Sequence, residues 1–301
     1  MAAKIGLHAC YFRGTEYERD VKGSILLAKQ SGCEVFEVAI ATITDLTREE
    51  RTEIKKYAQD LGMTLTANGG VDAKTDISSE DPDMRAAGIE KLKGILQAAY
   101  EIGAELFCGI NYTLWLSKPK QLLTYSEKQR FLEYSIDSVK KVIKTAENCN
   151  IQYCFEVVNR YEEFLLNTAE EGVEFARRVD SPNAKLLLDT FHMNIEEDNM
   201  FDAIRYAHQH GVLGHIHVGE SNRRIPGTGA SQIDWIAFFR TLQQIGYEKS
   251  IVMEPFVRMG LPTSMNCCVW RDLSQNQTLD AYMSDVAKGV SYLRSGMESQ
   301  Q

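Results

Sequence analysis

Four short segments in the second half of the chain each carry a polar, metal-competent side chain at or near their end. They read QYCFEV at residues 152–157, KLLLD at 185–189, GHIHV at 214–218 and SIVME at 250–254. The polar side chains are Glu156, Asp189, His217 and Glu254. Short runs rich in β-branched and aromatic residues predict strands, and longer stretches of helical period separate these four. This alternation is typical of a parallel sheet covered by helices.

The first half of the chain extends the same alternation to eight β/α units. Its predicted strands cover residues 4–8, 35–39, 64–67 and 106–109. The predicted helices cover residues 47–61, a segment that begins near Pro82, and residues 127–148, 168–179, 201–209, 235–245 and 279–293. Eight such units predict a (β/α)8 TIM barrel, formed by a single domain over residues 1–301.

Two of the predicted connections are longer than a tight loop needs, at about 111–125 and 220–231. Both follow strand ends, and in a barrel the loops after the strands form the catalytic face. The extra length suggests a cover over a substrate.

Two helix starts carry recognisable caps. Thr47 with Glu50 three residues later predicts a capping box. Ser79 or Asp81 precedes Pro82, which a helix tolerates in its first turn.

Composition restricts the class of protein. The chain has 301 residues, 44% of them hydrophobic, which is enough to bury a core without disulfides. Its formal charge of -9 argues against a nucleic-acid surface, because phosphate binding requires clustered basic residues. The seven cysteines are scattered and lack a C-x-x-C spacing, and no apolar run is long enough to span a membrane. We expect a soluble cytoplasmic protein with reduced thiols and neither nucleic-acid nor membrane partners.

The four polar strand ends predict a divalent-metal site. One glutamate at a strand end is usually solvated, but four converging polar groups in one barrel mouth require a cation, since a buried unpaired charge is costly. Three carboxylates and one imidazole suit Mn²⁺, Co²⁺ or Mg²⁺ better than structural zinc. His215 and His217 share a strand face, so periodicity alone does not choose between them. We predict His217 as the ligand because it lies nearer the catalytic end, and His215 as a core or ligand-orienting histidine.

Two carboxylates beside a metal suggest proton transfer at a carbon next to a ketone. A cation chelated by the carbonyl and neighbouring hydroxyl oxygens stabilises the enediolate left by deprotonation. Glu156 and Glu254 stand on different walls of the predicted mouth, so one can take a proton and the other return one to the opposite face. The same four residues could also serve hydrolysis or a C1 to C2 hydrogen shift.

Five separated motifs carry a resemblance that covers most of the chain. EVVNRYE, LDTFHMNIEE, GHIHVGESNR, VMEPFVRMG and VWRDLS resemble those of the ketose 3-epimerase family, which includes D-tagatose and D-allulose (D-psicose) 3-epimerases. The resemblance implies a xylose isomerase-like barrel that epimerises C3 of a free ketose, for example D-fructose to D-allulose or D-tagatose to D-sorbose. It also implies a homodimer or homotetramer and a divalent metal, for which we expect Mn²⁺ before Co²⁺ or Mg²⁺.

The resemblance also implies residue roles. Glu156 and Glu254 would be both metal ligands and the catalytic pair, with Asp189 and His217 completing the metal set. Residues implied to contact the substrate are Glu162, His192, Arg223 and Trp115. Each of them has a structural alternative: Glu162 as part of a solvated pair, His192 as a turn residue, Arg223 as an exposed lid charge, and Trp115 as an apolar lid anchor.

The first half departs more from the family. His8 stands where the family commonly has an aromatic residue, and the third strand ends in ANGG rather than a bulky group. Both positions line the region expected for the far end of the sugar, and we predict that His8 contacts substrate there.

Other functions fit parts of the same pattern. An aldose-ketose isomerase or sugar-phosphate epimerase could use this barrel, although Gly227 and Gly229 more simply form lid turns than a phosphate nest. A related repair nuclease would need a basic rim. A noncatalytic sugar-binding protein would not need two opposed glutamates.

Overall fold

A computed structural model describes residues 3–119 and 121–298 of the chain. Within these residues, eight parallel strands close into a barrel in sequence order, which confirms the predicted fold. The ring closes where β1 pairs with β8, with Leu7 opposite Met253. The strands are β1 (Lys4–His8), β2 (Val35–Ala39), β3 (Thr64–Asn68), β4 (Leu106–Gly109), β5 (Gln152–Val157), β6 (Ala184–Asp189), β7 (Leu213–Val218) and β8 (Ser250–Met253).

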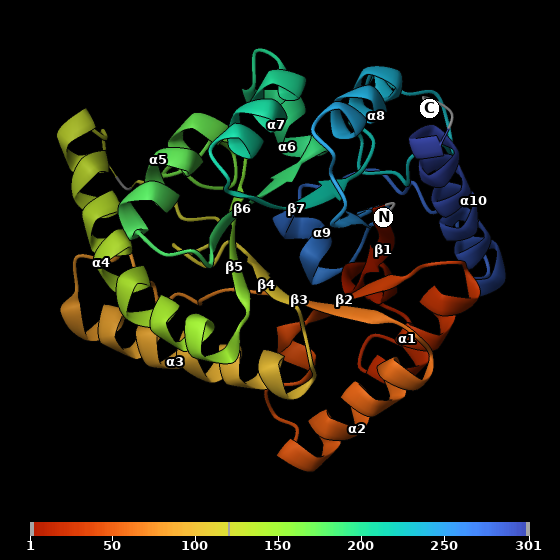
Figure 1. The fold of residues 1–301 in the computed structure, drawn as a ribbon, viewed down its shortest axis with the longest axis horizontal. Helices are drawn as coiled ribbons and strands as arrows, with labels where there is room; N and C mark the ends of the chain where they lie inside the picture. The colour runs from red at the N-terminus through yellow and green to blue at the C-terminus, as the bar shows by residue number, and fades with distance from the viewer. Residues whose placement is uncertain (1–2, 120, 299–301) are drawn as a thin grey trace.

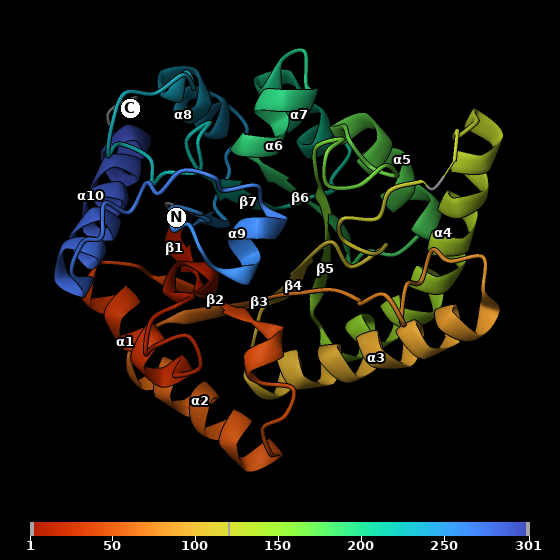
Figure 2. The ribbon, with the colours of Figure 1, turned by 180° about the vertical axis from the view of Figure 1, so that it is seen from behind.

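Helices surround the strands on the outside (Figure 1). The long ones are α1 (Val21–Gln30), α2 (Arg48–Asp60), α3 (Pro82–Glu101), α4 (Tyr125–Cys149), α5 (Ala169–Val179), α7 (Met200–Gln209), α8 (Trp235–Gln244) and α10 (Leu279–Glu298). Short helical turns are η1 (Ala9–Phe12), η2 (Ile40–Thr42), α6 (Thr190–Glu196) and α9 (Pro262–Asn266). In the view from behind, α9 lies in front of the strands near the centre of the barrel (Figure 2).

The element boundaries differ from the predicted ones by a few residues. Strand β8 ends at Met253, so Glu254 follows the strand instead of closing it. Helix α10 continues to Glu298, five residues beyond the predicted end at Leu293. The turns α6 and α9 were not predicted, because segments of seven and five residues are too short for a helical period to stand out.

The predicted caps form. Thr47 Oγ1 accepts from the Glu50 amide at 3.2 Å, and Glu50 Oε2 accepts from the Thr47 amide at 2.7 Å. Asp81, and not Ser79, caps α3 by accepting from the amides of Asp83 and Met84. A second capping box starts α4 at Thr124, which explains why that helix begins before the predicted residue 127.

The inner face of the barrel divides into an apolar lower layer and a polar upper layer. Leu106, Cys108, Cys154 and Leu187 form a small apolar cluster separate from the main core. Strand register sets polar residues side by side: His8 is opposite Glu37, Glu37 is opposite Thr66, and Asp189 is opposite His217. Alternation along each strand therefore gathers these side chains at one end of the barrel.

The cysteines form no disulfide. All seven are free, and Cys10, Cys33, Cys108 and Cys154 are buried. Among residues 3–119 and 121–298, no helix combines the length and apolar character required to cross a bilayer.

Glu163 anchors the loop between β5 and α5. Its buried carboxylate accepts from the amides of Leu165 at 2.5 Å and Leu166 at 2.7 Å, and from the Tyr112 hydroxyl at 3.1 Å. Burial raises the pKa of Glu163 to about 7, although these hydrogen bonds oppose the shift. Hydrogen bonds to the Glu163 carboxyl group therefore hold the loop that follows β5.

We expect Glu163→Gln to reduce the pH dependence of stability. Because the pKa of Glu163 is higher folded than unfolded, the folded state binds more protons between about pH 4.5 and pH 7, so stability falls as pH rises through this window. The contribution is on the order of 3 kcal/mol. Melting temperatures at about pH 5 and pH 8 should differ less in the variant than in the wild type. Exposed Glu174 provides the control, Glu174→Gln; equal pH dependence of both variants would contradict the assignment.

Candidate active site

Four side chains predicted as metal ligands meet in the barrel. Glu156 lies on β5, Asp189 ends β6, His217 lies on β7, and Glu254 directly follows β8. One oxygen or nitrogen from each lies within 4.8 Å of the others. All four are buried, Asp189 and His217 completely. Their convergence follows from the alternation of each strand, which turns the polar residue inward at the same end.

The ring of His217 is oriented for coordination. Its Nε2 lies 2.7 Å from Glu37 Oε1, and its Nδ1 lies 3.5 Å from Glu254 Oε2. An ionised carboxylate only accepts, so Nε2 carries a proton, and in the neutral ring that coordinates a metal the lone pair is on Nδ1. That Nδ1 is buried and has no hydrogen-bond partner. A buried, unpartnered imidazole nitrogen facing three carboxylates fits a divalent cation.

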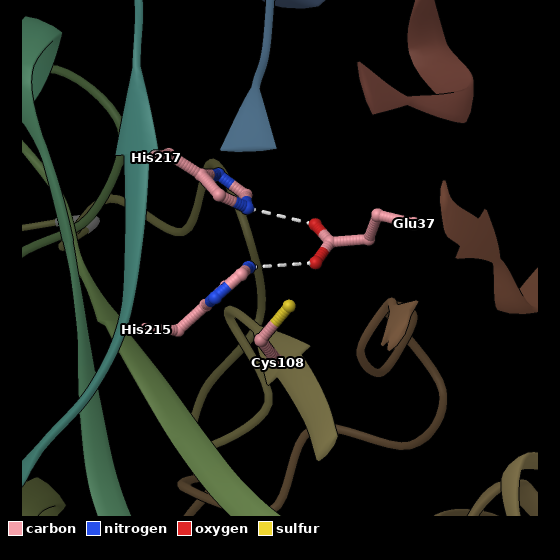
Figure 3. A group of neighbouring side chains, drawn as sticks. All are labelled: Glu37, Cys108, His215 and His217. Atoms are coloured by element: carbon pink, nitrogen blue, oxygen red, sulfur yellow. Dashed lines mark hydrogen bonds and ion pairs between the residues drawn. The ribbon is translucent and has the colours of Figure 1, made fainter. Parts of the chain in front are cut away.

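His215 lies one layer deeper and outside this group. Its Nε2 contacts the other oxygen of Glu37 at 2.9 Å. Figure 3 shows both histidines of β7 pointing at the single carboxylate of Glu37, with Cys108 beside them. His215 thus contacts Glu37, which in turn contacts His217.

Arg223 supplies a positive charge to the carboxylates. Its Nη1 donates to Asp189 Oδ2 at 2.6 Å and to Glu254 Oε2 at 3.1 Å. The guanidinium stacks over the Phe191 ring, with the central carbon 3.9 Å from the centroid. Arg223 is 6% exposed and its backbone has a φ of 63°, a conformation that is strained for arginine and recurs at functional sites. Arg223 is therefore not an exposed charged residue of a lid, which was its structural alternative.

The two glutamates have opposite pKa shifts. Burial raises the pKa of Glu156, and the nearby charge of Glu254 adds to this effect, while a contact with His192 opposes it. Burial also favours the neutral form of Glu254, but its interaction with His217 and the charge of Arg223 outweigh it and lower its pKa. The pair is therefore electrostatically unequal, as acid/base partners commonly are.

A cavity of about 210 Å³ opens above these groups. Drug-sized ligands occupy pockets of roughly 300–1,000 Å³, so this volume suits a smaller molecule such as a monosaccharide. The predicted site residues that line it are His8, Trp115, Glu156, Glu162, His192, Arg223 and Glu254. Asp189 and His217 lie beneath its floor, because both have no exposed surface.

Hydrogen bonds connect the loop after β5 with the long loop at 111–119. Trp115 Nε1 donates to Glu162 Oε2 at 2.8 Å, and the Leu116 amide donates to the Glu162 carbonyl at 2.9 Å. The Asn159 side chain lies 3.2 Å from Glu162 Oε1 and 2.7 Å from His192 Nδ1. Trp115, Glu162 and His192 are thereby held along one wall of the cavity, and Glu162 is not part of a solvated pair.

His8 presents a donor to the cavity. Its Nδ1 accepts from the Cys10 amide at 2.9 Å, and burial lowers its pKa, so the neutral ring carries its proton on Nε2. The Nε2 atom is buried without a hydrogen-bond partner, 3.7 Å from Glu37 Oε1 and 3.8 Å from Glu254 Oε1. This tautomer cannot ligate a metal through Nε2, but it can donate to an oxygen of a bound molecule.

Sequence reasoning missed three residues of the site. Glu37 lies inside the apolar strand VFEVA, and a charged residue between apolar neighbours on a strand was a signal for it. Asn159 belongs to the quoted motif EVVNRYE and was assigned no role, while Phe256 in VMEPF was left open between packing, substrate contact and interface. Phe256 lines the cavity beside Arg223, with the guanidinium carbon 5.1 Å from its ring centroid.

Comparison with known proteins agrees with this geometry. A family model described as xylose isomerase-like TIM barrel matches residues 25–270. The chain is 40% identical over 271 residues to a D-psicose 3-epimerase of Ruminiclostridium cellulolyticum, covering 90% of each chain. It is 31% identical to a ketose 3-epimerase of Arthrobacter globiformis, covering 93% of each. The crystal structure of D-psicose 3-epimerase with D-tagatose from Clostridium cellulolyticum superposes with a TM-score of 0.91 at 37% identity, covering 98% of this chain and 99% of that one.

The chain belongs to the xylose isomerase-like TIM barrels. The closed eight-stranded barrel, its carboxylate-rich mouth and the family match together define this class. Within that class, identities above 30% over nearly the whole length show a narrower membership. The chain belongs to the ketose 3-epimerase family.

Proposed function

We propose that this protein is a divalent-metal-dependent ketose 3-epimerase that acts on free ketoses. Membership of the family supports C3 epimerisation of a ketose as the reaction. The observation that carries the metal dependence is the set of four buried ligand residues with one atom each within 4.8 Å, together with the unpartnered Nδ1 of His217. Substrate pairs that fit are D-fructose with D-allulose and D-tagatose with D-sorbose.

Glu156 and Glu254 form the acid/base pair of this proposal. They come from β5 and from the end of β8, with β6 and β7 between them, so they reach a bound sugar from different walls. One carboxylate takes the proton from C3, and the electrons of the broken C–H bond move toward the C2 carbonyl to give a cis-enediolate. The other carboxylate delivers a proton to the opposite face of C3, which inverts the centre.

The metal would be held by Glu156, Asp189, His217 and Glu254. A bound divalent cation polarises the ketone and stabilises negative charge that develops on its oxygen. Carboxylate and imidazole ligands suit Mn²⁺, our preferred assignment, and also Co²⁺ or Mg²⁺. The titration of metal-depleted protein with each cation ranks them.

The remaining polar groups would hold the sugar. Glu162, His192 and Arg223 face the cavity and would contact the oxygens near the reacting carbons, while the Trp115 ring would cover the apolar side of the sugar. The Nε2–H of His8 would donate to a hydroxyl, a role that its fixed tautomer supports. The loops at 111–125 and 220–231 would cover the mouth of a single catalytic domain.

The cellular compartment and the oligomeric state of the protein are part of the same proposal. Seven free cysteines support a reducing compartment such as the cytoplasm. We propose a homodimer or homotetramer, for which the exposed Met259, Met265 and Trp270 offer apolar contact surface. Light scattering on a sizing column measures the assembly.

We expect Trp115→Phe to raise KM about fivefold with kcat nearly unchanged. The substitution keeps an aromatic ring but removes the indole donor to Glu162, and one hydrogen bond is worth about 1 kcal/mol. Steady-state kinetics on the ketose that turns over fastest measure the effect. Trp270, exposed and outside the cavity lining, supplies the matched control Trp270→Phe. A KM as low in Trp115→Phe as in the control would argue against a role for Trp115 in substrate binding.

The function is tested by proton exchange at C3. Manganese-loaded protein is incubated in deuterium oxide with D-fructose, D-tagatose or D-allulose, and both label and epimer are followed by NMR. Deuterium at C3 together with epimer, both abolished by a chelator, is the expected result. Label at C1 with an aldose product would show an aldose-ketose isomerase instead, and no exchange with any of the three would argue against free ketoses as substrates.

A further inference from the structure

Glu37 lies on β2, across the barrel from the histidines of β7, and is not one of the four candidate ligands. Its carboxylate is completely buried and accepts three hydrogen bonds. Oε1 accepts from His217 Nε2 at 2.7 Å, while Oε2 accepts from His215 Nε2 at 2.9 Å and from Thr66 Oγ1 at 2.8 Å. Figure 3 shows the two rings pointing at the carboxylate from the same side, each toward a different oxygen.

The charge state of Glu37 follows from these contacts. The Thr66 hydroxyl and the Nε2 atoms of both imidazoles all lie within hydrogen-bond distance of the carboxylate, which has only acceptor atoms to offer them. A carboxylate with three donors and no proton leaves both imidazole protons on Nε2. For His217, the bare nitrogen is then Nδ1, which lies 3.5 Å from Glu254 Oε2, one of the candidate ligands.

We propose that Glu37 is a positioning residue that fixes the metal-binding tautomer and ring orientation of His217, and that His215 holds the Glu37 carboxylate in place for this task. Metal-ligating histidines commonly donate their second nitrogen to a carboxylate in this way. The inference rests on the proposed metal site, but it concerns metal affinity and not the reaction at C3.

The geometry distinguishes this role from that of a structural core residue. If Glu37 served only to neutralise buried donors, either nitrogen of His217 could face the metal group with equal effect. The Nε2 contact at 2.7 Å and the unpartnered Nδ1 at the opposite side of the ring allow only one orientation. Removing Glu37 should therefore weaken metal binding through His217 and not at every ligand alike.

The test measures Mn²⁺ dissociation constants by the electron paramagnetic resonance signal of free Mn²⁺, which requires no turnover. Glu37→Met removes every acceptor while roughly filling the space, and should weaken Mn²⁺ binding about 10- to 100-fold. Glu37→Gln keeps one acceptor and should fall between that variant and the wild type. Thr66→Val removes one hydrogen bond but leaves both imidazole contacts, so it is the matched control and should change affinity less than about threefold.

A double-mutant cycle with His217→Gln separates tautomer control from the loss of a nearby negative charge. If Glu37 acts through His217, Glu37→Met should weaken Mn²⁺ binding far less once His217 is replaced. An equal loss in both backgrounds, or Mn²⁺ affinity of Glu37→Met within twofold of the wild type, would overturn the proposal. Should Glu37→Met fail to fold, Glu37→Gln provides the same comparison. Wild-type C3 exchange is measured independently, so failure of the epimerase assignment leaves this result interpretable.

Discussion

Replacing Glu254 by glutamine is expected to lower kcat/KM for C3 epimerisation by about a thousandfold. Acid/base groups contribute roughly 10²- to 10⁴-fold, and an amide cannot exchange a proton with carbon. The amide nearly preserves the shape of Glu254, whose carboxylate lies 3.1 Å from Arg223 Nη1 and 3.5 Å from His217 Nδ1. Assays at saturating Mn²⁺, with metal affinity measured alongside, distinguish a missing base from a missing ligand.

Deuterium exchange at C3 without net epimerisation tests the two glutamates separately. With Glu254 replaced, Glu156 should still exchange the C3 proton of the epimer that faces it, and Glu156→Gln should exchange the other epimer. The two variants should thus incorporate deuterium into opposite members of one epimer pair. Label in both epimers with either variant, or turnover above about a tenth of the wild type, would show that the two glutamates are not the opposed pair.

Removal of the divalent metal is expected to abolish turnover and to lower the melting temperature. Loss of Lewis-acid stabilisation costs several kcal/mol, which corresponds to at least about a hundredfold in rate. A metal present at about 100 times its dissociation constant stabilises the fold by about 2.7 kcal/mol, and this contribution disappears with the metal. Dialysis against a chelator followed by activity assays and thermal melts, before and after Mn²⁺ is added back, measures both effects.

Asp189→Asn is the control for the chelation experiment. Asparagine still accepts from the Phe191 amide, so α6 keeps its cap, but a charged ligand is lost. Chelator should therefore change the melting temperature of this variant much less than that of the wild type. Full activity after metal removal, with metal content verified by elemental analysis, would contradict the proposed metal dependence.

The fold was predictable because it depends on short-range patterns. The predicted strands match the observed ones within a residue at either end, since apolar runs of four to six residues bounded by turns are strong local signals. The capping box at Thr47 and the cap at Asp81 were readable for the same reason, as each involves residues two or three apart. The very short helices α6 and α9 carried too little pattern to be recognised, and no bounds were predicted for α1.

The candidate metal group was also predictable, because it follows from the positions of four residues along the sequence and from the geometry of a barrel. Each of Glu156, Asp189, His217 and Glu254 lies at or near a strand end, and parallel strands of a barrel bring those ends to one mouth. Substrate contacts were less accessible to this reasoning. The motif resemblance suggested Glu162, His192 and Arg223, but spacing alone did not show that Arg223 is buried against two of the carboxylates.

The amino-acid sequence by itself determined the barrel and the side chains that converge at its mouth, because the period of each strand dictates which residues point inward. Only the tertiary structure decided which inward residues touch. Glu37 meets His217 across 180 positions of sequence, and the Cys10 amide together with the barrel register places His8 near Glu37 and Glu254. Such partners depend on ring closure and strand register, which no local pattern encodes, and they select the histidine nitrogens that face the metal group and the cavity.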